Sequence, residues 1–316
     1  MATPSIAGQR VDPYPEYRRG VVLGATAYGL WGLFPLYWTL LSASGALETL
    51  AHRMMWSLVA VGTVLLWTRR VRSFLAVLRN RRQLGLLACA AVLISANWGA
   101  YIWGVNNGRV VETALGYFTG PIVSVLIGVL LLDERLRRAQ WVAVGLGVVA
   151  VVVLAIGYGQ VPWVALVLAF SFSTYGLVKK LAGVGAVESM AVETSVTLVP
   201  ALAYVVFLQA TGAGSFTSHG VGHALLLIGG GFVTMLPLLA FGGAAVRIPL
   251  SMIGMLQYLA PILQFAFGVL VFHEQMPPER WLGFGIVWAA LVILTIDGTR
   301  RRTPRTPRTL EPEPIP

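Results

Sequence analysis

Long apolar segments alternate with short polar joints along almost the whole chain. Each segment approaches the roughly 20 residues that an α-helix needs to cross the hydrocarbon core of a bilayer. Hydrocarbon offers no partner to backbone N–H and C=O groups, so such segments satisfy these groups by forming helices. The pattern predicts an all-α polytopic membrane protein. Ten transmembrane helices are expected, at about residues 20–41, 48–68, 84–105, 112–132, 139–156, 163–178, 188–208, 223–245, 250–272 and 281–296.

The chain contains an internal duplication. Residues 115–153 return as residues 255–293 at a constant shift of 140 residues without a gap. Identical residue types occur in the pairs Pro121/Pro261, Gly128/Gly268, Glu134/Glu274, Trp141/Trp281 and Gly145/Gly285. Matches at one fixed period indicate a repeat architecture. We expect two five-helix repeats, at residues 18–158 and 159–298.

Basic residues fall almost entirely on one side of the predicted spans. With the N-terminus inside, 20 of the 23 Lys and Arg residues lie in inside segments, as the positive-inside rule requires. Both termini are therefore expected in the cytoplasm, as disordered tails at residues 1–17 and 299–316, with the protein in the cell inner (plasma) membrane. Because each repeat has an odd number of helices, the repeats are expected to be inverted, an architecture that places transporter substrate sites near the midplane.

Composition narrows the possible functions. The chain is 57% hydrophobic and 11% charged, whereas soluble domains carry about 25% charged residues. The net charge of +10 reflects topology signals in the joints, so no nucleic-acid partner is expected. Cys89 is the only cysteine, which excludes an intramolecular disulfide. The sequence has no P-loop or HExxH motif, and we expect no cofactor, no metal and no catalytic residues.

Charged residues within spans are the first candidates for a substrate or coupling site, because a charge inside the membrane is costly. Arg53 and His52 lie in the second span and Glu193 in the seventh. The 140-residue shift aligns Arg53 with Glu193, so matching positions carry opposite charges. Straight helices would separate their depths by roughly 15 Å, so direct pairing does not follow from symmetry. The alternative is that Arg53 snorkels and Glu193 bonds to neighbouring helices.

Uncharged polar and aromatic residues supply a second layer of candidates. On the ninth span Gln257, Pro261, Gln264 and Gly268 share one helical face, which indicates a cavity lining. Pro121 and Pro261 are expected to break their helices and release backbone groups; close packing through small residues is the alternative. The full candidate set adds Trp31, Asn97, Trp98, Tyr101, Tyr117 and Tyr175.

Several blocks resemble the EamA-type RarD permeases of the drug/metabolite transporter superfamily. They are HRMMWS at residues 52–57, NWGAYIWGVNN at 97–107, ETALGYFTGP at 112–121, AFSFSTYGLVKK at 169–180, and Glu193 with Thr194. The resemblance covers about residues 18–298. It implies a ten-helix inner-membrane permease for small metabolites or drugs, and it leaves the substrate open.

The predicted function is therefore a secondary transporter that moves a small-molecule solute by alternating access, with proton coupling through Glu193 and His52 left open. A non-transporting membrane partner or scaffold would tolerate neutralisation of Arg53 and Glu193. A membrane enzyme acting on a lipid-soluble substrate would need clustered acids at one membrane face, where the sequence offers only Asp133 and Glu134. The oligomeric state stays undetermined.

Overall fold

The computed structural model describes residues 13–132, 136–245, 247–248 and 250–300. Helices make up the regular structure of these ranges, which contain no β-strand, and this confirms the all-α prediction. In the same ranges nine helical segments are long and apolar enough to cross a membrane, and a further apolar helix is shorter. The chain is an integral membrane protein.

The helices follow the predicted order. The long ones are α1 (Pro13–Gly32), α3 (Gly45–Trp67), α5 (Arg81–Asn106), α6 (Val110–Leu132), α7 (Arg138–Tyr158), α8 (Trp163–Ala182), α9 (Ala186–Thr211), α11 (Gly220–Ala245) and α14 (Pro278–Arg300). The short ones are α2 (Phe34–Thr39), η1 (Ser42–Ser44), α4 (Val71–Arg79), α10 (Ser215–Ser218), α12 (Leu250–Leu256) and α13 (Leu259–Leu270).

Two predicted boundaries are wrong. Residues 13–17, expected in the N-terminal tail, form the first turns of α1. Residues 71–79, expected to be a joint, form α4, because Val71, Phe74 and Val77 recur at helical spacing and pack against the core. Glu134, the repeat partner of Glu274, and Asp133 lie outside the described residues.

Proline explains where two spans are interrupted. Proline lacks an N–H and cannot bond to the carbonyl four residues before it. The ninth span is split at Gln257 and Tyr258, just before Pro261, and the first span is split at Leu33, just before Pro35. The predicted break at Pro121 is wrong, because α6 continues through this residue.

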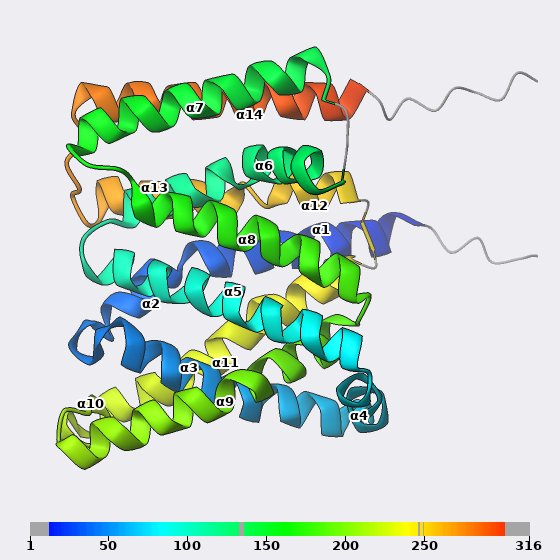
Figure 1. Ribbon diagram of the computed structural model, residues 1–316, viewed down its shortest axis with the longest axis vertical. Helices are drawn as coiled ribbons and strands as arrows, with labels where there is room; N and C mark the ends of the chain where they lie inside the picture. Colours follow the sequence, from blue (N-terminus) through cyan, green and yellow to red (C-terminus); the bar gives the residue numbers. More distant parts are fainter. Residues whose placement is uncertain (1–12, 133–135, 246, 249, 301–316) are drawn as a thin grey trace, which may run out of the picture.

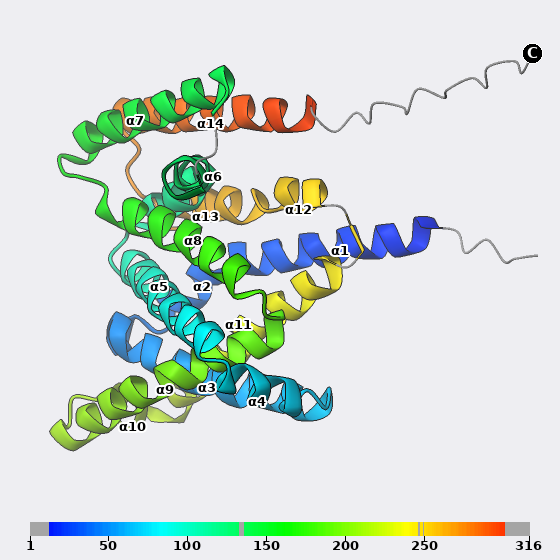
Figure 2. The same ribbon diagram turned by 45° about the vertical axis from the view of Figure 1, so that its right-hand side comes forward.

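The helices stack along the long axis of the molecule, with the pair α7 and α14 at one extreme (Figures 1 and 2). These two helices run antiparallel and pack side by side. Helix α1 contacts α11 and α13, while α8 contacts α5 and α6. The 140-residue shift aligns α1 with α8, α5 with α11 and α6 with α13, so the two sets of contacts correspond. Helix α3 likewise lies against α9, the helix with which the 140-residue shift aligns it.

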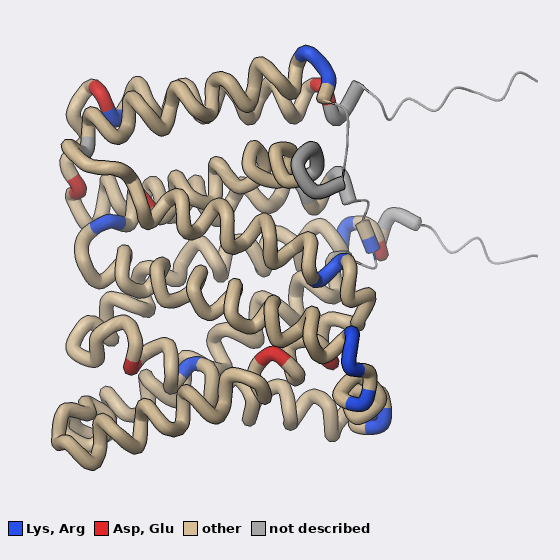
Figure 3. Tube along the Cα trace, viewed as in Figure 1, with Lys and Arg blue, Asp and Glu red and all other residues tan. Residues whose placement is uncertain are grey.

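The two ends of the bundle differ in charge. Helix α1 begins and α14 ends at one end, where most of the Lys and Arg residues gather (Figure 3). We call this the basic end. Three glutamates, Glu48, Glu112 and Glu274, lie near the opposite ends of their helices, beside the starts of α3 and α6 and after α13. We call that the carboxylate end.

Close approach of α3 and α11 depends on a glycine. A Cβ atom on Gly231 would lie 2.5 Å from the backbone nitrogen of Ser57 on α3. Backbone atoms cannot rotate away as side chains do, so the contact admits no side chain. The run of glycines at residues 229–231 therefore serves packing.

Gly231→Ala is expected to destabilise the protein, because overpacking of a close contact costs about 1–3 kcal/mol. The measurement is the midpoint of thermal unfolding in detergent. Gly242→Ala on the same helix is the matched control, since a Cβ there meets nothing within 4 Å. Equal midpoints for the two variants would show that the contact is not tight.

Candidate functional site

Arg53 lies in an aromatic box inside the bundle. Helix α3 places it there with only 2% of its surface exposed. Its guanidinium carbon lies 3.7 Å from the ring centre of Trp98, 4.9 Å from Trp38 and 5.8 Å from Phe34. A cation over a ring face is stabilised by the ring quadrupole, and more so where water is excluded. The rings hold the charge without neutralising it.

Several hydrogen-bond donors of this box have no acceptor among the described residues. Nε and Nη1 of Arg53, Nε1 of Trp38 and the hydroxyl of Tyr101 are all buried without a partner there. Tyr101 is 2% exposed and belongs to the same buried cluster as Phe34 and Trp38. Buried polar groups in proteins are nearly always hydrogen-bonded. A set made of unmatched donors suits a ligand that carries acceptor oxygens and negative charge.

Asn97 forms a bonded network beside the box. It is fully buried on α5, and its Nδ2 donates to the Leu168 carbonyl and to Ser171 Oγ, both at 3.0 Å. The hydroxyl of Tyr117 donates to Asn97 Oδ1 at 3.2 Å. The Tyr117 ring lies 5.8 Å from that of Tyr101. Asn97 thus links α5, α6 and α8, and positions one wall of the box.

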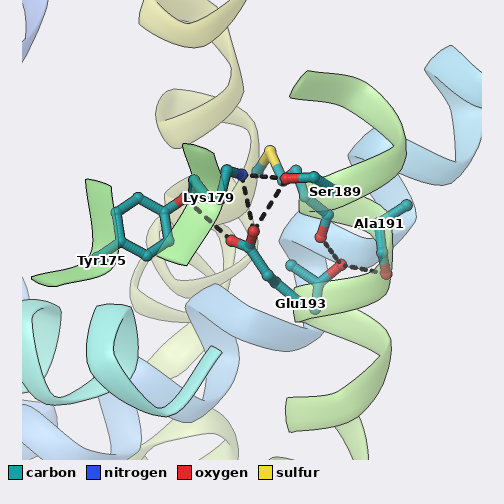
Figure 4. A network of polar contacts seen from close by, with 7 residues as sticks. Tyr175, Lys179, Ser189, Ala191 and Glu193 are labelled. Atoms are coloured by element: carbon teal, nitrogen blue, oxygen red, sulfur yellow. Dashed lines mark hydrogen bonds and ion pairs between the residues drawn. The ribbon is translucent and has the colours of Figure 1, made fainter. Parts of the chain in front are cut away.

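Glu193 belongs to a separate polar cluster (Figure 4). Its carboxylate lies 2.7 Å from Lys179 Nζ, accepts from Tyr175 at 3.1 Å, and accepts from Ser189 at 3.0 Å. Lys179 also donates to Ser189. No ion pair joins Glu193 to Arg53 among the described residues. The two charges serve different clusters.

Lys179 lies within a helix. The predicted span at residues 163–178 ends one residue before it, which would place Lys179 in the cytoplasmic joint among the basic residues that set the topology. Helix α8 continues to Ala182, so Lys179 occupies its last turns and reaches Glu193 on α9. The sequence contains a pattern that could have predicted this pair. Tyr175 and Lys179 are one turn apart on a helix, and a buried carboxylate such as Glu193 needs a partner.

His52 points elsewhere. Its ring stacks on Phe216 at 4.8 Å with an interplanar angle of 10°. Both ring nitrogens are buried and unpartnered among the described residues. His52 thus packs against α10 and is part of neither the Glu193 cluster nor the box around Arg53.

The predicted polar face of the ninth span is divided. Gln264 is 3% exposed, and its Nε2 donates to the carbonyl of Trp31 at 3.2 Å. That carbonyl lies four residues before Pro35 and is left free by it. Gln257 is exposed in the turn that interrupts the span, and its predicted place on a cavity lining stays a prediction. Pro261 is buried just beyond the break.

The chain matches known transporters over most of its length. Residues 18–156 match the EamA-like transporter family. Protein RarD of Streptomyces exfoliatus is 62% identical over 285 residues, covering 90% of each chain. The uncharacterized transporter YojE of Bacillus subtilis is 42% identical, covering 90% of this chain and 96% of its own. Chloramphenicol-sensitive protein RarD of Pseudomonas aeruginosa is 29% identical over 89% of this chain and 95% of its own.

A solved structure shares the fold. Its chain, titled "Crystal structure of protein", superposes with a TM-score of 0.56 at 18% identity, covering 90% of this chain and 98% of that one. At this identity the likeness concerns the fold alone.

Breaking the Lys179–Glu193 pair is expected to destabilise the protein. Removing one partner of a buried pair leaves an uncompensated charge, at a cost of about 3–5 kcal/mol; the partial exposure of Lys179 (23%) lowers that cost through solvent screening. Lys179→Gln and Glu193→Gln should each lower the unfolding midpoint, and the double variant should lower it by less than the sum. Lys180→Gln, an exposed neighbour, is the control. Strict additivity would show that the pair is not coupled.

Proposed function

Since this chain belongs to the RarD group of EamA-like transporters, we propose that it is a secondary transporter that carries a small anionic solute across the plasma membrane by alternating access. The observation that carries the proposal is the buried Arg53 with its unmatched donors. A carboxylate or similar oxyanion would supply the acceptors that Arg53, Trp38 and Tyr101 lack among the described residues.

The aromatic walls define the rest of the ligand. Trp98, Trp38 and Phe34 surround the guanidinium and offer flat apolar faces. Ligand sites are mostly apolar with a few polar groups that fix orientation. We infer that the solute has an oxyanion at one end and an apolar body that fits against these rings.

The two-fold arrangement of the helices supports alternating access. Transporters built from inverted repeats expose a fixed central site to each side in turn, by moving one repeat against the other. The matched contacts of α1 and α8, and the pairing of α3 with α9, suit such an exchange. We place both termini in the cytoplasm, because the basic end fits the inside of a membrane.

Glu193 has a separate role in this proposal. Lys179 neutralises it in this conformation. If Lys179 moves away when the basic end opens, Glu193 would need a proton or another cation. Proton coupling is therefore the expected form of energy supply, and flux that ignores an imposed pH gradient would count against it.

The first test concerns Arg53. Purified protein is screened by thermal shift against small organic acids, amino acids and amphenicols, and hits are followed by flux in proteoliposomes. Arg53→Ala should abolish both the shift and the flux for an anionic solute, because the substitution removes the charged donors. Arg82→Ala, an exposed residue at the start of α5, should change neither.

The second test concerns Glu193. Glu193→Gln is expected to stop flux while the protein remains folded in the membrane and still binds its solute, since Arg53 is untouched. Flux is measured with and without a pH gradient. If Arg53→Ala and Glu193→Gln both transport normally, these residues are not the site, and a scaffold role becomes the better account.

A further inference from the structure

The carboxylate end of the bundle is closed by glutamates that cross from one repeat to the other. Glu274, after α13, accepts from the backbone N–H groups of Val110 and Val111 at the start of α6, the latter at 3.1 Å. Glu112 on α6 accepts from the N–H of Val164 on α8 at 2.9 Å. Each contact joins a carboxylate of one repeat to the first turn of a helix in the other.

A third contact repeats this chemistry. Glu48 on α3 accepts from the N–H of Ser215 on α10 at 2.7 Å, and both residues are at least 95% buried. The first N–H groups of a helix have no partner within it, and negative charge there is favoured by the helix dipole. All three contacts would be lost if the repeats separated at this end.

The backbone near Glu274 is shaped for this contact. Helix α13 ends at Leu270, and the N–H of Glu274 bonds back to the Gly268 carbonyl at 2.9 Å. His273 adopts a left-handed conformation, with φ 51°, which turns Glu274 toward α6. A Cβ atom on Gly268 would lie 2.6 Å from Val111 Cγ2 and 3.0 Å from the Val111 nitrogen. Gly268 thus permits α13 to touch the start of α6.

The basic end is held differently. Ion pairs join the repeats there: Arg70 to Glu188 at 3.4 Å, Arg137 to Asp297 at 3.2 Å, and Arg247 to Glu16 at 2.8 Å. The arginine side chains are 54%, 34% and 26% exposed. Exposed ion pairs contribute little and are screened by salt. Buried carboxylates that accept from backbone N–H groups are less weakened by solvent and by salt.

We propose that Glu274, with Glu112 and Glu48, forms the latch of the gate at the carboxylate end, closed in this structure and released when that end opens to the extracellular side. This inference rests on the proposed transport function. Glu274 is its switchable member, because it lies in a connector and is only partly buried. Gly268 lets the latch close, because it allows α13 to approach the start of α6.

The latch should respond to pH. Burial raises the pKa of Glu274 to about 7, against the lowering effects of the Val111 and Val110 N–H groups and of Arg280, while the charge of Glu112 adds to the rise. Arg109 is paired with Glu112 at 3.3 Å, and His273 and Glu279 are the nearby titratable groups along the connector. An open latch would return Glu274 to its ordinary, lower pKa. Closure therefore takes up a proton, and mild acid favours the closed state.

The test measures opening directly. Cys89→Ala removes the single native thiol, and Val105→Cys places a reporter where the native side chain is 3% exposed near the carboxylate end. The full-length protein in lipid nanodiscs is treated with a hydrophilic maleimide. Glu274→Ala leaves two N–H groups without their acceptor, a loss of about 1–3 kcal/mol. The reporter should react about tenfold faster, the factor that corresponds to ~1.4 kcal/mol. Gly268→Ala should also accelerate it, without changing any charge.

Controls separate opening from unfolding. Glu279→Gln, an exposed glutamate in the same region, should leave the rate unchanged. A second reporter, Met190→Cys near the basic end, should not react faster in Glu274→Ala. Acceleration at both reporters would mean general loosening and would overturn the proposal, as would an unchanged rate at Val105→Cys.

Measuring the reaction rate at different pH values is a separate test of the latch. With native Glu274 the rate at Val105→Cys, corrected for the reagent's own pH dependence, should fall between pH 8 and 6. Glu274→Gln should abolish this fall, and persistence of the fall would overturn the assignment. The assay involves neither solute nor flux. A failed Arg53 transport test would therefore refute the transport proposal while leaving the latch result in place.

Discussion

A polar group inside a membrane has no water to bond with, so each polar group must find its hydrogen-bond partner within the protein. At several places in the described part of this chain, a side chain of one helix forms a hydrogen bond with a backbone group of another. Gln264 binds the Trp31 carbonyl that Pro35 leaves free, and Asn97 binds the Leu168 carbonyl. Glu112 and Glu274 bind the starts of helices. These bonds cross between elements, so they also determine how the helices are arranged.

Arg53 is one of the exceptions, which also include both ring nitrogens of His52. Neither Nε nor Nη1 finds an acceptor among the described residues, and Trp38 and Tyr101 beside it also keep unmatched donors. Real proteins break local rules of consistency mainly at functional sites. These unmatched donors are the reason why we propose Arg53 as the solute site; the presence of a charge in a span is a weaker argument. Glu193, by contrast, has three side-chain partners in this conformation and would need a movement to change its role.

The repeats use their symmetry unequally. Matching helices make matching contacts, yet the aligned positions Arg53 and Glu193 carry opposite charges and sit in unrelated clusters. The two ends of the bundle also differ, with buried carboxylates on backbone N–H groups at one end and partly exposed arginine ion pairs at the other. In the transport mechanism that we propose, a symmetric frame would let the bundle exchange two conformations. The asymmetric side chains would then set which conformation is favoured and what the site binds.

The length of the apolar segments predicted the helical class and nearly all spans, because an apolar segment of about 20 residues in lipid satisfies its backbone as a helix. The fixed 140-residue shift likewise indicated the repeat, and the cost of buried charge singled out Arg53 and Glu193. Sequence reasoning failed where a side chain reaches another helix. The sequence placed Lys179 just beyond a predicted span, and it did not indicate that Glu112 and Glu274 reach other helices. Partners such as Lys179 and Glu193, or Glu274 and Val111, depend on how helices distant in sequence are packed. Only the tertiary structure decides that.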